Sequence, residues 1–261
     1  IPKPDGRLRP LGIPTVRDRV AQQACKIVIE PLFEASFLPC SYGYRPKRSA
    51  GQAMQAVRSA LVRNDCVVEA DIVGYFDNVD HEILMSLVER RISDRRVLRL
   101  LRQWLHAGVM VDGQRHETRT GVPQGGVISP LLANIYLHSL DRWWQEHHGR
   151  VGQLVRYCDD FVIVCRDRVA AERARKHVAA FLGRLKLRLH ETKTRVVDMA
   201  SDGFDFLGFH FRKLLSRRSG RVAPYAWPSP KAMQRVRATI RKHTDRRRLC
   251  VPLPELVAAL N

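Results

Sequence analysis

Two adjacent carboxylates, Asp159 and Asp160, stand between two apolar stretches of the sequence. Leu154 and Val155 precede them, and residues 161–165 (FVIVC) follow them. These flanks predict two short β-strands, with the turn between them on the two aspartates. Adjacent carboxylates in a turn repel each other, and a divalent cation such as Mg²⁺, which prefers hard oxygen ligands, would offset that repulsion.

A second apolar stretch supplies another carboxylate. Residues 67–70 (VVEA) predict a strand that leads into Asp71, which is followed by an aromatic pair at residues 75 and 76. Asp71, Asp159 and Asp160 together could hold two metal ions roughly 4 Å apart, the arrangement used for in-line phosphoryl displacement. An Asp-Asp pair alone is more often an ordinary turn, so this interpretation depends on the other motifs.

Those motifs occur in one order and resemble a reverse transcriptase, most closely the bacterial group II intron type. The resemblance covers nearly the whole chain. Its motifs are IPKPDG (1–6), RPLGIP (9–14), Asp71 before YF, PQGG (123–126), SPLLANIYL (129–137), YCDD (157–160) and FLGF (206–209).

The resemblance implies an α/β (α+β) right-hand polymerase fold with an antiparallel palm sheet backed by helices. Residues 1–66 would form the fingers, 67–212 the palm with an insertion at about 79–121, and 213–261 a linker and the start of the thumb. It implies RNA-templated DNA synthesis with two Mg²⁺ ions, for which Mn²⁺ could substitute. The metal ligands would be Asp71, Asp159, Asp160 and the backbone of Ile72.

The resemblance also assigns residues to the substrates. Tyr75 would lie under the sugar of the incoming nucleotide and exclude a 2′-hydroxyl; the alternative is that Tyr75 is a core aromatic and Phe76 faces the sugar. Lys193 would orient the triphosphate or protonate the pyrophosphate, unless it is only a surface lysine. The remaining nucleotide contacts would be Lys3, Arg9 and Gln124, and the primer grip would be Phe206, Leu207, Gly208 and Phe209.

The charge of the chain favours a nucleic-acid partner. Lys and Arg number 45 against 26 Asp and Glu, a net charge of +19, which predicts salt-sensitive binding to an anionic polymer. The sequence contains no apolar stretch of about 18 residues, the length that would predict a helix spanning a membrane. The six cysteines form no C-x-x-C pair, which favours reduced thiols and a cytoplasmic protein. The resemblance implies a bacterial protein associated with the nucleoid. The expected partners are an RNA template, a DNA primer, dNTPs and structured intron RNA.

Helices are expected at about 19–34, after Ser49, after Asp80, after Asp94, from Ser129 (as N-cap) to about His147, at 168–185 and after Pro230. A hairpin is expected at 108–122, turning at residues 112–113. Residues 41–46 form a loop that either touches template or nucleotide or is a packed turn. Residues 213–221 are expected to be either a flexible connection or a loop against nucleic acid, and 249–261 to begin a further helix. Because the sequence starts inside a motif, we expect more chain before residue 1 and beyond residue 261.

Two other functions remain open at this stage. The chain could be a non-catalytic RNA-binding maturase or scaffold, although all three aspartates are present. It could also be a CRISPR-associated reverse transcriptase, which shares these motifs and differs in its fused domains. An RNA-templated RNA polymerase is disfavoured by Tyr75 and by the group II-like runs.

Overall fold

The computed structural model describes residues 12–111, 114–116, 120–123, 125–216 and 220–245, with 252, 254, 255 and 257. The predicted contacts Lys3, Arg9 and Gln124, the hairpin turn at 112–113 and most of the predicted helix at 249–261 lie outside these residues. The chain divides into two compact units, Ile1–Asp198 and Met199–Asn261. The assignment of fingers, palm and thumb stays a prediction.

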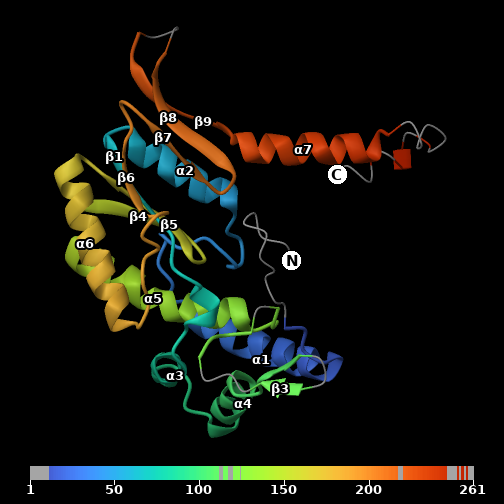
Figure 1. Ribbon diagram of the computed structural model, residues 1–261. Helices are drawn as coiled ribbons and strands as arrows, with labels where there is room; N and C mark the ends of the chain where they lie inside the picture. The colour runs from blue at the N-terminus through green and yellow to red at the C-terminus, as the bar shows by residue number, and fades with distance from the viewer. Residues whose placement is uncertain are drawn as a thin grey trace. The chain divides into compact units, whose positions relative to one another are not determined.

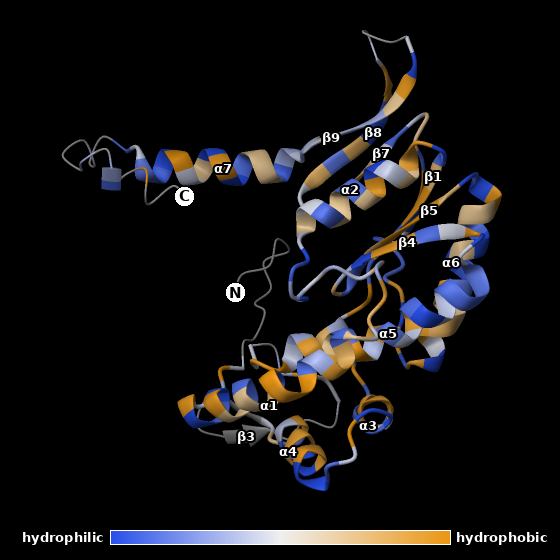
Figure 2. Cartoon of the chain, turned by 180° about the vertical axis from the view of Figure 1, so that it is seen from behind, coloured by the Kyte–Doolittle hydropathy of each residue, from blue (hydrophilic) through white to orange (hydrophobic). Residues whose placement is uncertain are grey.

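The first unit is built on a four-stranded sheet in the order β4-β5-β1-β6 (Figure 1). Its strands are β4 (Gly152–Tyr157), β5 (Asp160–Cys165), β1 (Cys66–Ala70) and β6 (Arg195–Asp198). Every pairing in it is antiparallel. The predicted antiparallel sheet in a mixed helix-and-strand fold is therefore confirmed, and the two central strands are almost wholly apolar, as Figure 2 shows.

Helices bury the apolar side chains of this sheet. α5 (Ser129–His148) and α6 (Arg168–Arg184) share one hydrophobic cluster with Val68, Phe161 and Ile163. Side chains alternate between the two faces of a strand, so Val67 and Val162 point the other way. They too are fully buried, and α2 (Ala50–Leu61) packs against β4 and β5 with a buried face of its own.

Polar side chains fix where several helices begin. Ser49 and Gln52 form a reciprocal capping box on α2, which satisfies backbone N–H groups that have no partner within the helix. Asp80 caps α3 (His81–Glu89) and Asp94 caps α4 (Arg95–Leu105), as predicted. The prediction that Ser129 caps α5 is wrong, because the N-cap residue is Ile128 and the Ser129 hydroxyl donates instead to the Pro123 carbonyl at 2.7 Å.

α1 (Val16–Glu34) forms where predicted but does not bury its most apolar stripe. Val20, Ile27 and Val28 are more than 60% exposed, whereas Gln22 and Ile29 are buried. The Gln22 side-chain oxygen accepts a hydrogen bond from the Val127 backbone at 2.9 Å. A short hairpin, β2 (Val109–Val111) with β3 (Gln114–His116), follows α4 as predicted.

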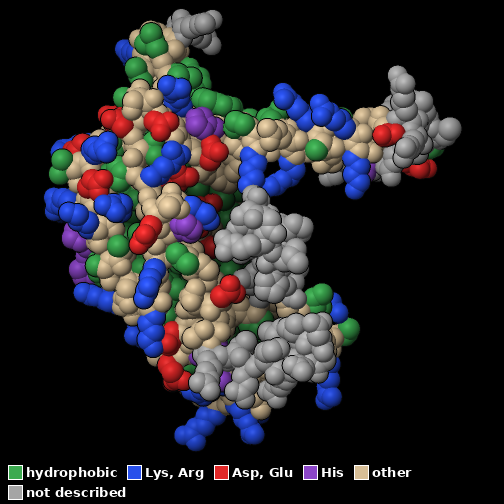
Figure 3. Space-filling model, viewed as in Figure 1, with side chains coloured by type: hydrophobic (Ala, Val, Ile, Leu, Met, Phe, Trp, Pro, Cys, Tyr) green, Lys and Arg blue, Asp and Glu red, His purple; other side chains and the backbone are tan. Residues whose placement is uncertain are grey.

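The second unit is a three-stranded antiparallel sheet, β7-β8-β9, followed by a helix. Its elements are β7 (Gly203–Phe206), β8 (Phe209–Leu215), β9 (Val222–Pro228) and α7 (Pro230–His243). The predicted flexible connection at 213–221 is wrong at its beginning, because β8 extends to Leu215. β9 was not predicted, whereas the start of α7 after Ser229 was. Lys and Arg side chains line α7 (Figure 3).

Candidate active site

The three predicted carboxylates lie at one end of the first sheet. Asp71 directly follows β1, and Asp160 is the first residue of β5. Ala70 of β1 pairs with Phe161 of β5. Asp71 and Asp160 are therefore the next residues along these two neighbouring strands, at the end of the sheet. Antiparallel pairing thus brings together residues almost ninety positions apart in the sequence.

The turn between β4 and β5 is one residue earlier than predicted. Tyr157 pairs with Asp160, which leaves Cys158 and Asp159 as the two turn residues, while Asp160 already belongs to the strand. Cys158 has a left-handed backbone (φ 61°), a conformation that is unfavourable for a residue with a side chain. The packing described below must hold this turn in place.

The carboxylates are close enough to influence one another. The pKa of Asp160 is raised to about 7 because protein atoms displace water from around its carboxyl group, although the residue as a whole is exposed at the surface. The negative charges of Asp159, Asp71 and Glu69 raise it further. Sequence reasoning did not include Glu69, whose position two residues before Asp71 on β1 could have suggested it.

Two cations offset part of this negative charge. Lys193 Nζ donates to Asp71 Oδ2 at 2.8 Å, and Arg195 Nε donates to Glu69 Oε2 at 2.7 Å. The backbone of the lysine-bearing segment is tied to the same place, since the His190 amide donates to the Asp71 carbonyl at 2.8 Å. The structure therefore places the predicted Lys193 in direct contact with a predicted metal ligand.

The donor set suits a hard divalent cation. Among the described residues no three His, Cys, Asp or Glu side chains converge closely enough to hold a metal ion, and Lys193 engages one oxygen of Asp71. The remaining carboxylate oxygens of Asp71, Asp159 and Asp160 are of the type that Mg²⁺ prefers. The pKa of Asp160 is raised first by the loss of water around its carboxyl group and then by repulsion from the neighbouring carboxylates, and a bound cation would relieve that repulsion.

A buried arginine beneath the turn joins it to the rest of the unit. Arg156 is fully buried and donates through Nε (2.8 Å) and Nη2 (2.5 Å) to the two carboxylate oxygens of the equally buried Asp141. It also donates to the Cys158 carbonyl (2.8 Å), Asn134 Oδ1 (3.0 Å) and Ser41 Oγ (2.8 Å). Burial alone would lower the pKa of Arg156, but Asp141 reverses that effect and the pKa is raised, so the guanidinium stays charged.

The loop at residues 41–46 lies directly against the turn. A Cβ atom on Gly43 would be 2.5 Å from the Cys158 backbone nitrogen, a distance that no side chain tolerates. Arg45 is buried and donates to Glu34 and to the carbonyls of Leu38 and Ser41. The loop is thus a packed turn, as one of the two predictions had it, while the Tyr44 side chain remains 56% exposed.

The structure corrects the prediction for Tyr75. Its side chain is 2% exposed, and its hydroxyl donates to the Ala133 carbonyl at 2.6 Å, so it cannot border a sugar. Phe76 is only partly buried, and its ring meets the Tyr75 ring edge-on with 5.4 Å between centroids. Both residues lie in a 3₁₀ turn (Tyr75–Asp77) that begins after a left-handed Gly74. The alternative, with Tyr75 in the core, agrees with the structure.

The loop before α5 packs closely on this aromatic turn. The Val122 amide donates to the Phe76 carbonyl at 2.7 Å, and the Gly121 amide donates to the Val79 carbonyl at 2.8 Å. A Cβ on Gly121 would be 2.9 Å from the carbonyl oxygens of Phe76 and Asp77. Glycine at this position therefore allows the loop that carries the predicted Gln124 to follow the aromatic turn.

In the second unit, Leu207 and Gly208 form the two-residue turn between β7 and β8. Both have a left-handed backbone, with φ of 52° and 81°, as a type I′ hairpin turn requires. Phe206 is 1% exposed and Phe209 is partly exposed. The Phe206 side chain therefore packs inside this unit, and the primer grip at residues 206–209 stays a prediction.

Comparison with known proteins agrees with this geometry. Residues 1–211 match the family described as "Reverse transcriptase (RNA-dependent DNA polymerase)". The chain belongs to the reverse transcriptase family. It is 40% identical over 256 residues to Protein YkfC of Escherichia coli, an alignment that covers 84% of this chain and 66% of YkfC. It is 30% identical over 281 residues to the group II intron-encoded protein LtrA of Lactococcus lactis, an alignment that covers 83% of this chain and 47% of LtrA. This reverse transcriptase chain thus spans less than two thirds of the length of either relative.

Solved structures confirm the right-hand polymerase fold. Apo telomerase from Candida tropicalis, truncated from the C-terminal domain, matches with a TM-score of 0.54 at 14% identity, over 75% of this chain and 43% of the telomerase. Telomerase from Candida albicans in complex with a fragment of telomeric RNA matches with a TM-score of 0.53 at 13% identity, over 87% of this chain and 41% of the telomerase chain. At such low identity the likeness shows the fold alone. In the described part of this reverse transcriptase, no helix has the length and apolar character needed to cross a membrane.

Proposed function

We propose that this chain is an RNA-templated DNA polymerase that adds deoxynucleotides to a primer 3′-hydroxyl. The observation that carries the proposal is the arrangement of Asp71, Asp159 and Asp160 at the paired ends of β1 and the β4–β5 hairpin. Divalent cations held by these three residues would help the primer hydroxyl to ionise and would stabilise charge on the phosphates. Mg²⁺ is the expected cation, and structured intron RNA is an expected partner.

Lys193 has a role in this proposal that follows from its contact with Asp71. Its ammonium group lies 2.8 Å from a carboxylate oxygen and is 62% exposed, so a short rotation of its flexible side chain would bring it to an anionic ligand at the same site. There it would orient a phosphate or donate a proton to the leaving group. Lys3, Arg9 and Gln124 are proposed as further nucleotide contacts by their positions in the sequence motifs.

Phe76 is the residue we assign to sugar selection. Its ring is accessible, whereas Tyr75 supports it from the core. A rigid aromatic ring under the sugar leaves no room for a 2′-hydroxyl, so ribonucleotides would be rejected by steric exclusion. Replacing Phe76 by Val should therefore raise the use of NTPs relative to dNTPs. Tyr75→Phe is the matched control, because its hydroxyl bonds inward to Ala133, and it should leave that ratio unchanged.

Primer extension on an RNA template with Mg²⁺ tests the proposal. The parent chain should extend with dNTPs and Asp159→Asn should not. Glu172→Gln is the matched control: it makes the same acid-to-amide change on the exposed face of α6, where Glu172 pairs with Arg175. If Asp159→Asn extends as well as the control, the catalytic assignment is wrong.

RNA binding without catalysis is the second candidate function. The net charge of +19 and the relatives that are named as intron-encoded proteins favour it. If neither the parent nor the variants extend a primer while all bind RNA with the same affinity, this function replaces the first.

A further inference from the structure

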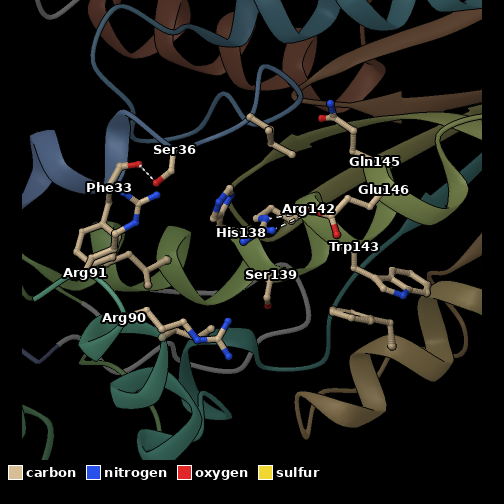
Figure 4. A pocket seen from close by; sticks show the side chains of 14 residues that line it. Phe33, Ser36, Arg90, Arg91, His138, Ser139, Arg142, Trp143, Gln145 and Glu146 are labelled. Carbon is tan, nitrogen blue, oxygen red and sulfur yellow. Dashed lines mark hydrogen bonds and ion pairs between the residues drawn. The ribbon is translucent and has the colours of Figure 1, made fainter.

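A cavity of about 680 Å³ lies in the first unit among the ends of α1 and α3, one face of α5, and α6 (Figure 4). No residue assigned above to catalysis or to nucleotide binding lines it. We refer to it as the α5 cavity. Its volume is in the range of cavities that hold ligands of nucleotide size.

The walls of the α5 cavity are largely apolar and partly aromatic. Phe33, Leu87 and Ile135 line it from α1, α3 and α5. On the α6 side, the rings of Trp143 and Phe181 are stacked, with 4.3 Å between centroids and an interplanar angle of 19°. Both side chains are only partly buried and both line the cavity, so part of their aromatic surface is accessible from it.

Guanidinium groups surround these apolar walls. Arg90 and Arg91 reach the α5 cavity from the end of α3, and Arg142 reaches it from α5 (Figure 4). The one carboxylate among the lining residues, Glu146, is already paired with Arg142 at 2.9 Å. Arg90 and Arg91 are exposed, and in the described part of the chain neither makes an ion pair. The cavity therefore combines a stacking surface with two guanidinium groups that are available to an anion.

Polar atoms complete the lining. Ser139 and His138 lie on the same face of α5 as Arg142, and Gln145 lies one turn further along (Figure 4). The Ser139 hydroxyl donates to the Tyr136 carbonyl and keeps its lone pairs as acceptors. These groups could bond the edge of a heterocycle that enters between the aromatic and cationic walls.

We propose that the α5 cavity binds one unpaired nucleotide of an RNA strand, with its base against Trp143 and Phe181 and its phosphate on Arg90 and Arg91. Arginine holds phosphate oxygens in pairs, and protein aromatics stack on bases that have left a helix. A base inside a duplex could not enter. The proposal takes from the proposed function only that RNA is the partner, and it is independent of polymerisation.

An acidic peptide carrying an apolar side chain is the competing occupant, since it too would satisfy arginines around an apolar cavity. The observations favour RNA because the site combines a stacked aromatic pair with guanidinium groups, in a chain of net charge +19. The competing occupant is one outcome of the test.

Binding of the whole chain to two RNA hairpins tests the proposal. The hairpins are identical except that one carries a single unpaired nucleotide, and affinity is measured by fluorescence anisotropy without dNTPs or divalent cations. The parent should prefer the bulged hairpin about tenfold, the ratio that one stacked base supplies. Because no polymerisation step is involved, failure of the polymerase proposal would leave this result unchanged.

The variant Arg90→Gln/Arg91→Gln should lose that preference. Arg95→Gln/Arg99→Gln is the matched control, since it removes the same charge from exposed positions of α4 outside the cavity. The control should weaken binding to both hairpins equally and keep their ratio. Trp143→Leu, which retains an apolar side chain, should lose the preference without a change in charge.

A photoreactive 4-thiouridine at the bulge locates the contact directly. The crosslink should map to the peptides that contain Trp143 or Phe181. The proposal is overturned if the parent binds both hairpins alike, if both double-arginine variants lose the preference equally, or if the crosslink maps elsewhere. It is also overturned if an acidic phenylalanine peptide binds at the cavity while the bulged RNA shows no preference.

Discussion

Arg156 and Asp141 allow a quantitative test of how the turn between β4 and β5 is held. Arg156→Met removes the guanidinium and keeps most of the side-chain volume, which leaves Asp141 fully buried without a counter-charge. Breaking a buried pair in this way costs about 3–5 kcal/mol. The carbonyl of Cys158 and the oxygens of Asn134 and Ser41 also lose a donor.

Urea unfolding followed by tryptophan fluorescence measures this cost. At a typical slope of about 2–3 kcal/mol per molar urea, the midpoint of Arg156→Met should fall by about 1–2.5 M. Arg175→Met is the matched control, because Arg175 pairs with Glu172 on an exposed face and such pairs contribute at most about 1 kcal/mol.

The double variant Arg156→Met/Asp141→Leu separates the two causes. It removes the uncompensated charge together with its partner, so its midpoint should lie above that of Arg156→Met alone and its cost should be below the sum of the single changes. The reasoning is refuted if Arg156→Met unfolds at the same urea concentration as the Arg175→Met control, or if the costs of the two single changes simply add.

Three further predictions concern individual contacts. Gly43→Ala should destabilise the chain by about 1–3 kcal/mol, because the new Cβ would meet the Cys158 nitrogen. Gly183→Ala is the control, since a Cβ there meets nothing within 4 Å, and it should stabilise α6 by about 0.5–1 kcal/mol. Thermal melts of the two variants measure the difference. Lys193→Met should slow single-turnover primer extension by about tenfold or more, and an unchanged rate would make it a surface lysine. Burial lowers the pKa of His138 below its usual 6.5 in the folded chain. The contribution of His138 to stability is therefore complete above about pH 7 and is lost as the pH falls from 6.5 toward its pKa in the folded state. His138→Leu should reduce the drop in melting temperature between pH 7.5 and 5.5.

Much of the site could be read from the sequence because its parts are local. The apolar flanks of Asp159 and Asp160 predicted β4 and β5, and the run before Asp71 predicted β1. The resemblance to reverse transcriptases then predicted that Asp71 lies beside Asp159 and Asp160. The periodicity of the apolar residues alone could not predict this proximity. The roles of these aspartates, of Lys193 and of the predicted metal ions stay predictions until activity is measured.

The choice between Tyr75 and Phe76 could not be made from spacing. Adjacent aromatics in a tight turn point in different directions, and here the turn follows a left-handed Gly74 and places Tyr75 in the core. The Arg156 network was missed for a different reason. Its partners Asp141, Asn134 and Ser41 lie 15, 22 and 115 positions away, and nothing local distinguishes Arg156 from the many exposed arginines.

β9 was missed because Pro224 and Pro228 argue against a strand. Both lie in β9, which is an edge strand of its sheet, and an edge strand has an unpaired side where a missing N–H is tolerated. In α1 the helix formed where it was predicted, but the structure leaves Val20, Ile27 and Val28 exposed.

The central position of β1 constrains how the chain can fold. β1 is made early in the sequence, yet its two neighbours, β5 and β6, come from residues 160–165 and 195–198. The β4–β5 hairpin can close by itself within microseconds, whereas β1 must wait for two long loop closures. During synthesis the apolar strand Cys66–Ala70 therefore has no strand partner until about residue 165 has left the ribosome, and it lacks its second partner until about residue 198 has done so. That interval is when the nascent chain is most exposed to aggregation and has the greatest need of a chaperone.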